Sequence, residues 1–202
     1  MNLDILPIGL YGENSYVLHD QNHVLLIDPG RYPDEIRKRI RKQEKTDAIV
    51  LTHGHEDHTG AVDDLEDVYH CPVYMSEKDF PLTDPANAGK LGYSAPVYAK
   101  ITPFTEITQA GYFRLQIIET PGHTSGSVCI RYRNLLFTGD TLFAGDIGRT
   151  DLYSGSEEEM LRSLQKFRNM PHDLQVFPGH GPSSTIGREL AVNPYLQSSY
   201  TI

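Results

Sequence analysis

The chain has 202 residues, with 18 Lys and Arg against 27 Asp and Glu, which gives a formal net charge of −9. That length suits one domain, and the acidic balance disfavours a nucleic-acid binder, which needs basic residues to displace counterions from phosphate. Two cysteines, Cys71 and Cys129, cannot form a disulfide framework or a four-thiolate zinc site, so we expect small core residues.

The first residues and the hydropathy of the chain predict its location in the cell. No basic segment followed by an apolar run opens the sequence, so we predict no signal peptide. No stretch approaches the roughly 20 apolar residues that cross a bilayer. We therefore expect a single domain over residues 1–202, located in the cytoplasm, with no membrane or nucleic-acid partner.

Three short strands and a helix are predicted first. The strands cover Leu3–Ile8, Ser15–His19 and His23–Asp28, and the last stops at a Pro-Gly turn. A helix is predicted from Pro33, because proline and the acidic residues that follow it favour a first helical turn.

This helix is expected to continue through a basic segment, residues 37–45. The cations of the region are Arg31, Arg37, Lys38, Arg39, Arg41, Lys42 and Lys45. They are consistent with an anion-binding patch for an acidic substrate or with a solvated helix face, and charge runs are usually solvated faces.

Strands and helices continue to alternate in the rest of the chain. The predicted strands are Asp47–Thr52, Pro72–Met75, Phe113–Glu119, Ser127–Tyr132, Leu135–Thr138 and Leu174–Phe177. One helix is expected near Gly60–Asp67, and another is capped by Ser154 or Ser156. Residues 84–98 indicate a long loop or short helices, and Pro194 marks the tail. Polar clusters follow the strands, where α/β sheets place their ligands.

The densest polar cluster directly follows the predicted strand Asp47–Thr52. It places His53, His55, Asp57 and His58 within six positions. Alternation along an extended segment points the first two histidines the same way, while Asp57 and His58 start the next turn and can serve a neighbouring site. A histidine-rich surface loop is the alternative, but three further turns supply potential ligands after strands: His123, Asp140 and His180. Imidazole and carboxylate suit zinc, iron or manganese.

With these motifs in family order, after Asp28 in Asp28-Pro29-Gly30, the chain resembles the metallo-β-lactamase-fold superfamily of hydrolases. The resemblance implies an α/β fold, an αββα sandwich of four layers with a two-metal site at one edge. It also implies ligand roles: His53, His55 and His123 for the first metal, Asp57, His58 and His180 for the second, and Asp140 bridging both. It implies that Asp28 supports a ligand and does not itself bind metal.

Within the superfamily, the segment Thr141–Leu152, with Gly148-Arg149-Thr150-Asp151, and the segment Pro178–Thr185 resemble short glyoxalase II enzymes. Long glyoxalase II enzymes carry a helical C-terminal domain that holds glutathione, and here only 22 residues follow His180 (202 − 180 = 22). We therefore expect no appended substrate-binding domain.

The resemblance implies hydrolysis of a small thioester of the hydroxyacylglutathione type. Two divalent cations, zinc first and iron or manganese as alternatives, would supply a hydroxide nucleophile, with Asp57 and Asp140 as catalytic residues. A thiolate needs no strong acid to leave. The main alternative is a persulfide dioxygenase, which would use one iron at His53, His123 and Asp140. A non-catalytic structural metal domain is a third, less favoured because structural sites are usually closed four-ligand sites.

The remaining polar candidates have weaker expectations. Arg149 is expected to contact substrate or to form a buried salt bridge with Asp151 or Asp146. Four histidines outside the strand-end turns are expected to be structural or exposed: His19, His23, His70 and His172.

Overall fold

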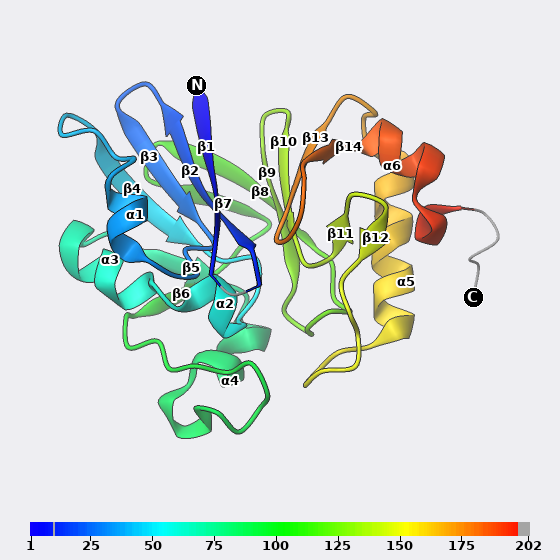
Figure 1. Ribbon diagram of the computed structural model, residues 1–202, viewed down its shortest axis with the longest axis horizontal. Coiled ribbons are helices and arrows are strands. Elements are labelled where there is room, and N and C mark those ends of the chain that lie inside the picture. The colour runs from blue at the N-terminus through cyan, green and yellow to red at the C-terminus, as the bar shows by residue number, and fades with distance from the viewer. Residues whose placement is uncertain (10, 198–202) are drawn as a thin grey trace.

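The computed structural model describes residues 1–9 and 11–197, and two β-sheets lie face to face at its centre (Figure 1). The first sheet has the order β1 (Asn2–Ile8), β2 (Glu13–Asp20), β3 (His23–Ile27), β4 (Lys45–Val50), β5 (Val73–Met75) and β6 (Ile101–Pro103). Strands β1 to β3 are antiparallel, and β3 to β6 are parallel.

The second sheet comes mainly from the C-terminal half of the chain. Its order is β14 (Ser184–Thr185), β13 (Gln175–Pro178), β10 (Leu135–Gly139), β9 (Val128–Tyr132), β8 (Phe113–Glu119) and β7 (Ile107–Ala110). Among the described strands of this second sheet, only β10 and β13 pair in parallel. A small hairpin, β11 (Leu142–Phe143) with β12 (Asp146–Ile147), follows β10.

Helices cover the outer face of each sheet, which completes the four layers of the predicted αββα sandwich (Figure 1). The helices are α1 (Pro33–Arg37), α2 (Glu56–Thr59), α3 (Val62–Tyr69), α4 (Phe80–Thr83), α5 (Glu157–Gln165) and α6 (Ile186–Val192). Helices α1 and α3 lie on the first sheet, and α5 and α6 on the second. Ser156 caps α5, because its hydroxyl accepts the amide hydrogen of Glu159.

Alternation along the strands explains why both faces of each sheet are buried. In β2, Tyr16 and Leu18 point between the sheets, while Val17 points toward α1 and α3. The ring of Tyr16 packs edge-on against Phe137 of the opposite sheet, with centroids 5.1 Å apart. Successive side chains of a strand point to opposite faces, so an unbroken apolar run fills two layers at once.

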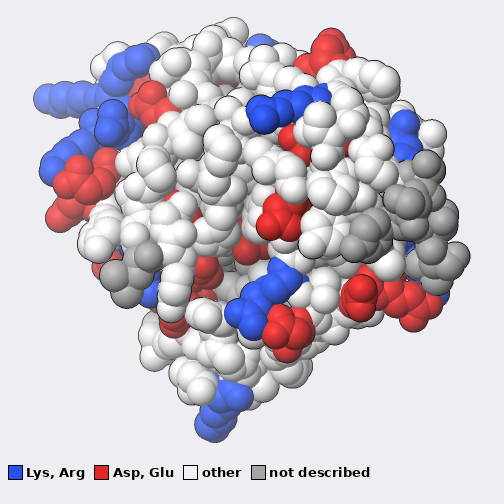
Figure 2. Space-filling model, turned by 45° about the vertical axis from the view of Figure 1, so that its right-hand side comes forward, with Lys and Arg blue, Asp and Glu red and all other residues white. Residues whose placement is uncertain are grey.

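The expected basic helix over residues 37–45 is wrong. Helix α1 ends at Arg37, and turns lead from there to β4. Like charges three and four residues apart destabilise a helix, so the cations of this segment do not extend it. Four of them, Arg37, Lys38, Arg41 and Lys45, pair instead with nearby acids, as Lys38 does with Glu35 at 2.6 Å. Figure 2 shows Lys and Arg interspersed with Asp and Glu on the face it presents, without a continuous basic surface there.

Other differences concern short elements. The sequence did not predict β6, β7, the β11–β12 hairpin, β14 or α6, all of which are seven residues or shorter. The expected helix near Gly60–Asp67 consists of α2 and α3, separated by Gly60 and Ala61. Residues 84–98 contain no element longer than one 3₁₀ turn. No helix among the described residues is long and apolar enough to cross a membrane.

Candidate metal centre

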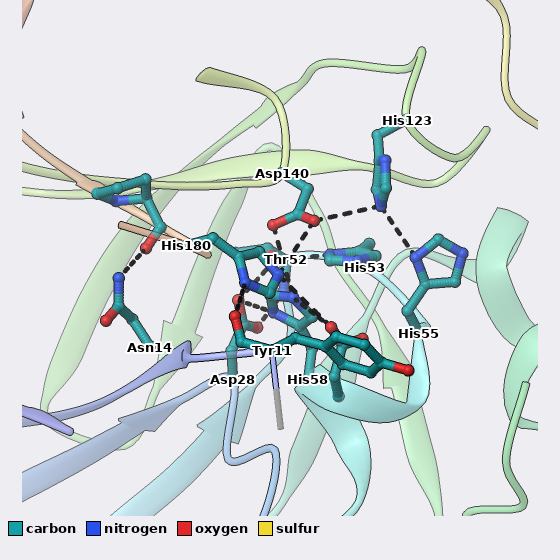
Figure 3. Close-up of polar contacts among 12 residues, drawn as sticks. Tyr11, Asn14, Asp28, Thr52, His53, His55, His58, His123, Asp140 and His180 are labelled. Atoms are coloured by element: carbon teal, nitrogen blue, oxygen red, sulfur yellow. Dashed lines mark hydrogen bonds and ion pairs between the residues drawn. The ribbon is translucent and has the colours of Figure 1, made fainter. Parts of the chain in front are cut away.

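Three histidines from two loops converge on one point (Figure 3). His53 and His55 lie in the loop after β4, and His123 lies in the loop after β8. All three are nearly inaccessible, at 1 to 3% exposure. Nδ1 of His55 and Nε2 of His123 lie 2.9 Å apart. A cation that accepts lone pairs from both nitrogens would satisfy this close approach.

A second group lies beside the first. Asp57 and His58 belong to α2, and His180 lies in the loop after β13. Oδ2 of Asp57 is 3.4 Å from Nε2 of His180 and 3.9 Å from Nε2 of His58. Segments more than 120 positions apart in sequence therefore meet at this point.

Asp140 lies between the two groups, directly after β10 (Figure 3). Its carboxylate oxygens are 3.5 Å from Nε2 of His123, 3.5 Å from Nε2 of His58 and 3.4 Å from Nε2 of His180. The loops close tightly around it, because a Cβ at Gly179 would lie only 2.1 Å from Oδ1 of Asp140. Only glycine fits there.

The donor set fits divalent cations. Nε2 of His53, Nε2 of His58 and Oδ1 of Asp140 are buried and have no hydrogen-bond partner in the part of the chain that the structure describes. Such groups are costly unless something satisfies them, and buried charges are usually paired or bind metals. The seven residues that the sequence suggested as ligands therefore come together, and the identity of the metal does not follow from imidazole and carboxylate alone.

Hydrogen bonds orient the imidazoles from behind. Asp28 accepts the amide hydrogen of Thr52 at 2.7 Å and the Thr52 hydroxyl hydrogen at 2.6 Å, and it lies 3.1 Å from Nδ1 of His58. Nδ1 of His123 lies 2.7 Å from the carbonyl oxygen of Arg149. A carboxylate or carbonyl on one ring nitrogen leaves the other nitrogen free for a metal. Asp28 itself belongs to none of the potential ligand groups among the described residues.

The two groups differ in charge. Burial, together with neighbouring histidines, lowers the pKa of His55 to about 3 and holds that of His53 well below its usual range. Burial opposes protonation of His58 and His180 as well, but Asp57 and Asp140 outweigh it and raise their pKa values to about 9 and about 11. Without a cation, His53 and His55 are therefore neutral at pH 7, whereas His58 and His180 carry a proton that a metal ion would have to displace.

The pKa values of the two aspartates are lowered, in contrast to those of His58 and His180. Burial alone would raise the pKa of Asp57, but the nearby His58 and His180 lower it to about 2. The same two histidines, with His123, hold the pKa of Asp140 far below its usual range. Both aspartates are therefore ionised at neutral pH.

A cavity of about 170 Å³ opens above these residues. Its rim is formed by Tyr11, Tyr93, Leu152 and Arg149. The expected salt bridge of Arg149 with Asp151 is present at 2.7 Å and 2.8 Å, but the expectation that it is buried is wrong, since the Arg149 side chain is 54% exposed. Arg149 is among the residues that line the cavity, and its backbone carbonyl oxygen lies 2.7 Å from Nδ1 of His123.

Sequence reasoning missed three residues at this centre. Tyr11 and Tyr93 come from separate loops, and their rings meet edge to face with centroids 6.0 Å apart. Asp79 is buried beneath the loops. None of the three belongs to a motif, so only their position in space reveals them. The four other histidines (His19, His23, His70 and His172) belong to no potential ligand group in residues 1–9 and 11–197.

Comparison with known proteins decides the family. The family model described as "Metallo-beta-lactamase superfamily" matches residues 8–180. The chain belongs to this superfamily.

Two curated relatives of this superfamily member cover nearly the whole chain. "Probable metallo-hydrolase YqgX" of Bacillus subtilis is 33% identical and covers 95% of each chain. "Hydroxyacylglutathione hydrolase GloC" of Haemophilus influenzae is 32% identical, over 98% of this chain and 99% of its own. The protein is thus a metallo-hydrolase of the superfamily.

Solved structures give the same fold. The B3 metallo-beta-lactamase BLEG-1 superposes with a TM-score of 0.88 at 35% identity, over 98% of this chain and 100% of its own. TTHA1623, in a di-iron-bound form, superposes with a TM-score of 0.82 at 32% identity, over 94% of this chain and 98% of its own. The αββα sandwich is therefore the metallo-beta-lactamase fold.

Proposed function

We propose that this metallo-hydrolase cleaves a small thioester of the hydroxyacylglutathione type at a centre of two divalent cations. The position of Asp140 carries the proposal, because its carboxylate lies within 3.5 Å of histidine nitrogens from both ligand groups. A carboxylate there can bridge two ions. His53, His55 and His123 would hold one ion, and Asp57, His58 and His180 the other. Zinc is the proposed metal, and the same donors accept iron or manganese.

When bound, two such ions would supply a hydroxide nucleophile near neutral pH and would stabilise negative charge on the attacked carbonyl. Asp57 and Asp140 are the proposed catalytic residues, since they are ionised and are the acids that line the cavity. As proposed ligands they offer no proton to a leaving group. A thiolate, whose conjugate acid has a pKa of about 8.5, leaves without one, whereas an amine does not. Because these aspartates supply no proton to the leaving group, the site favours thioesters over amides as substrates.

The size of the cavity limits the substrate. Ligand pockets for drug-sized molecules usually measure about 300–1,000 Å³, and this one holds about 170 Å³. A short acyl group fits beside the metal ligands, while a larger thiol carrier extends past the rim. Tyr11 and Tyr93 would bound the acyl group, and Arg149 would attract a carboxylate of the carrier.

Metal content tests the proposal first. Elemental analysis of protein purified without added metal should find two ions per chain, and the loaded protein should hydrolyse S-lactoylglutathione faster than a β-lactam. One iron per chain with oxygen uptake on a persulfide would instead favour the dioxygenase, whose two-histidine, one-carboxylate set is His53, His123 and Asp140. Folding that depends on metal without any turnover would point to a structural site.

Replacing Arg149 with glutamine should raise KM for S-lactoylglutathione about tenfold and leave kcat nearly unchanged. The exposed guanidinium would bind the carrier equally well in the ground state and the transition state, so its loss removes uniform binding. Steady-state kinetics measures the split. Arg162→Gln is the matched control, because Arg162 is also exposed and paired with acids but lies on α5. A fall in kcat alone would contradict the binding role.

We further propose that residues 1–202 act as one domain in the cytoplasm on a small molecule. The two thiols support that location, because Cys71 and Cys129 are free and buried.

A further inference from the structure

Asp79 is a buried acid that joins two loops of the centre. It lies at the end of the 3₁₀ turn Glu77–Asp79 and is 1% exposed. One carboxylate oxygen accepts hydrogen bonds from the Gly54 amide at 3.0 Å and from the Thr124 hydroxyl at 2.7 Å. The other oxygen accepts the Gly126 amide hydrogen at 2.8 Å.

The two loops that Asp79 joins carry the first histidine group. Gly54 lies between His53 and His55, and Thr124 directly follows His123. The second group has different supports, since His58 is oriented by Asp28 and Nδ1 of His180 lies 3.3 Å from the carbonyl oxygen of Tyr11. The Asp79 carboxylate therefore bonds to residues adjacent to or near His53, His55 and His123 in sequence, and none of these hydrogen bonds goes to a neighbour of Asp57, His58 or His180.

The contacts leave Asp79 little freedom. A Cβ at Gly126 would lie 2.5 Å from Cγ of Asp79, and a Cβ at Gly54 would lie 3.0 Å from the backbone oxygen of Asp79. The Thr124 hydroxyl is 2.8 Å from the Ser127 hydroxyl, which can donate to it while Thr124 donates to Asp79. Both loops are consequently fixed relative to one acceptor.

We propose that Asp79 is a positioning residue that sets the spacing of His53, His55 and His123 and thereby controls cation affinity at that group alone. The inference rests on one part of the proposed function, namely that these histidines hold a metal ion. It does not depend on the substrate, so a protein that binds two cations without cleaving thioesters would leave it intact.

The decisive variant is Asp79→Asn. An amide keeps the size but loses the charge, and its NH₂ must face either the Gly126 amide or the Gly54 amide and Thr124 hydroxyl, all of which donate to Asp79. We expect Zn²⁺ affinity at the first group to fall about 10- to 100-fold, the range for residues that orient metal ligands. Competition with a chromophoric chelator measures it, and the visible spectrum of the Co²⁺ form should change as well.

Two further variants separate positioning from general stability. Asp47→Asn is the matched control, because Asp47 is also buried and accepts the Tyr112 amide hydrogen at 2.8 Å, at the opposite end of β4. It should lower the unfolding temperature and leave both Zn²⁺ affinities unchanged. Thr124→Val removes one hydrogen bond and keeps the charge, so it should weaken the first group less than Asp79→Asn does.

The two ligand groups are told apart with His180→Gln, which removes a ligand from the second group only. In that background Asp79→Asn should still weaken the remaining site. The proposal would be overturned if Asp79→Asn kept the parent Zn²⁺ affinity at the first group. It would also be overturned if Asp79→Asn alone lowered the Zn²⁺ affinity equally at both groups. If Asp79→Asn fails to fold, Thr124→Val takes its place as the test. A Thr124→Val protein with the Zn²⁺ affinity and the Co²⁺ spectrum of the parent would then refute the proposal.

Discussion

Replacing Asp140 with asparagine should reduce hydrolysis by about 1000-fold, the range for removing one preorganised electrostatic contact from an active site. The amide keeps the shape of the side chain but removes the negative charge that lies between the two histidine groups. Without that charge, two nearby cations repel each other with less compensation, so metal content should fall below two ions per chain. Elemental analysis and S-lactoylglutathione turnover measure the two effects together.

Asp146→Asn is the control for the loss of one negative charge from the chain. Asp146 is exposed on the β11–β12 hairpin, and its carboxylate accepts the Ile147 amide hydrogen. This variant should keep parent metal content and activity. An Asp140→Asn enzyme with two ions and parent turnover would show that the bridging role is wrong.

Acidification should weaken cation binding at Asp57, His58 and His180 by about 100-fold per pH unit below pH 9, because two protons compete with the ion. Burial opposes the charge on both histidines, yet the aspartates raise their pKa values to about 9 and about 11. The imidazoles of His58 and His180 are therefore both protonated at pH 7 before a cation binds. Calorimetry in buffers with different ionisation enthalpies should detect about two protons released per ion.

The first histidine group should behave differently. His53 and His55 have lowered pKa values and are unprotonated at pH 7, so they release no proton when an ion binds. Changing His180 to glutamine should lower the release at the second group by about one proton. The exposed His172, changed to glutamine, provides the control and should leave the release unchanged. Release near zero at the second group would contradict the assigned charge states.

Long apolar strands were predictable because their pattern is local. Residues 113–118 alternate between buried and less buried positions, and the predicted strand Phe113–Glu119 matches β8 at both ends. Short elements such as β6, β7 and β14 were not predictable, because two to four residues carry too little periodicity and form only where a neighbouring strand offers hydrogen bonds.

Residue types and their positions along the chain indicated which side chains could bind a metal. Histidines and aspartates directly after strands, next to glycine, predicted a metal site because strand ends meet at one edge of a sheet. The distances between these side chains could not be read from the sequence. Folding brings Asp140 to both histidine groups, leaves the Arg149 side chain exposed beside the cavity, and joins two loops through Asp79. These contacts join residues far apart in the chain, and a carboxylate buried among distant loops leaves no local pattern.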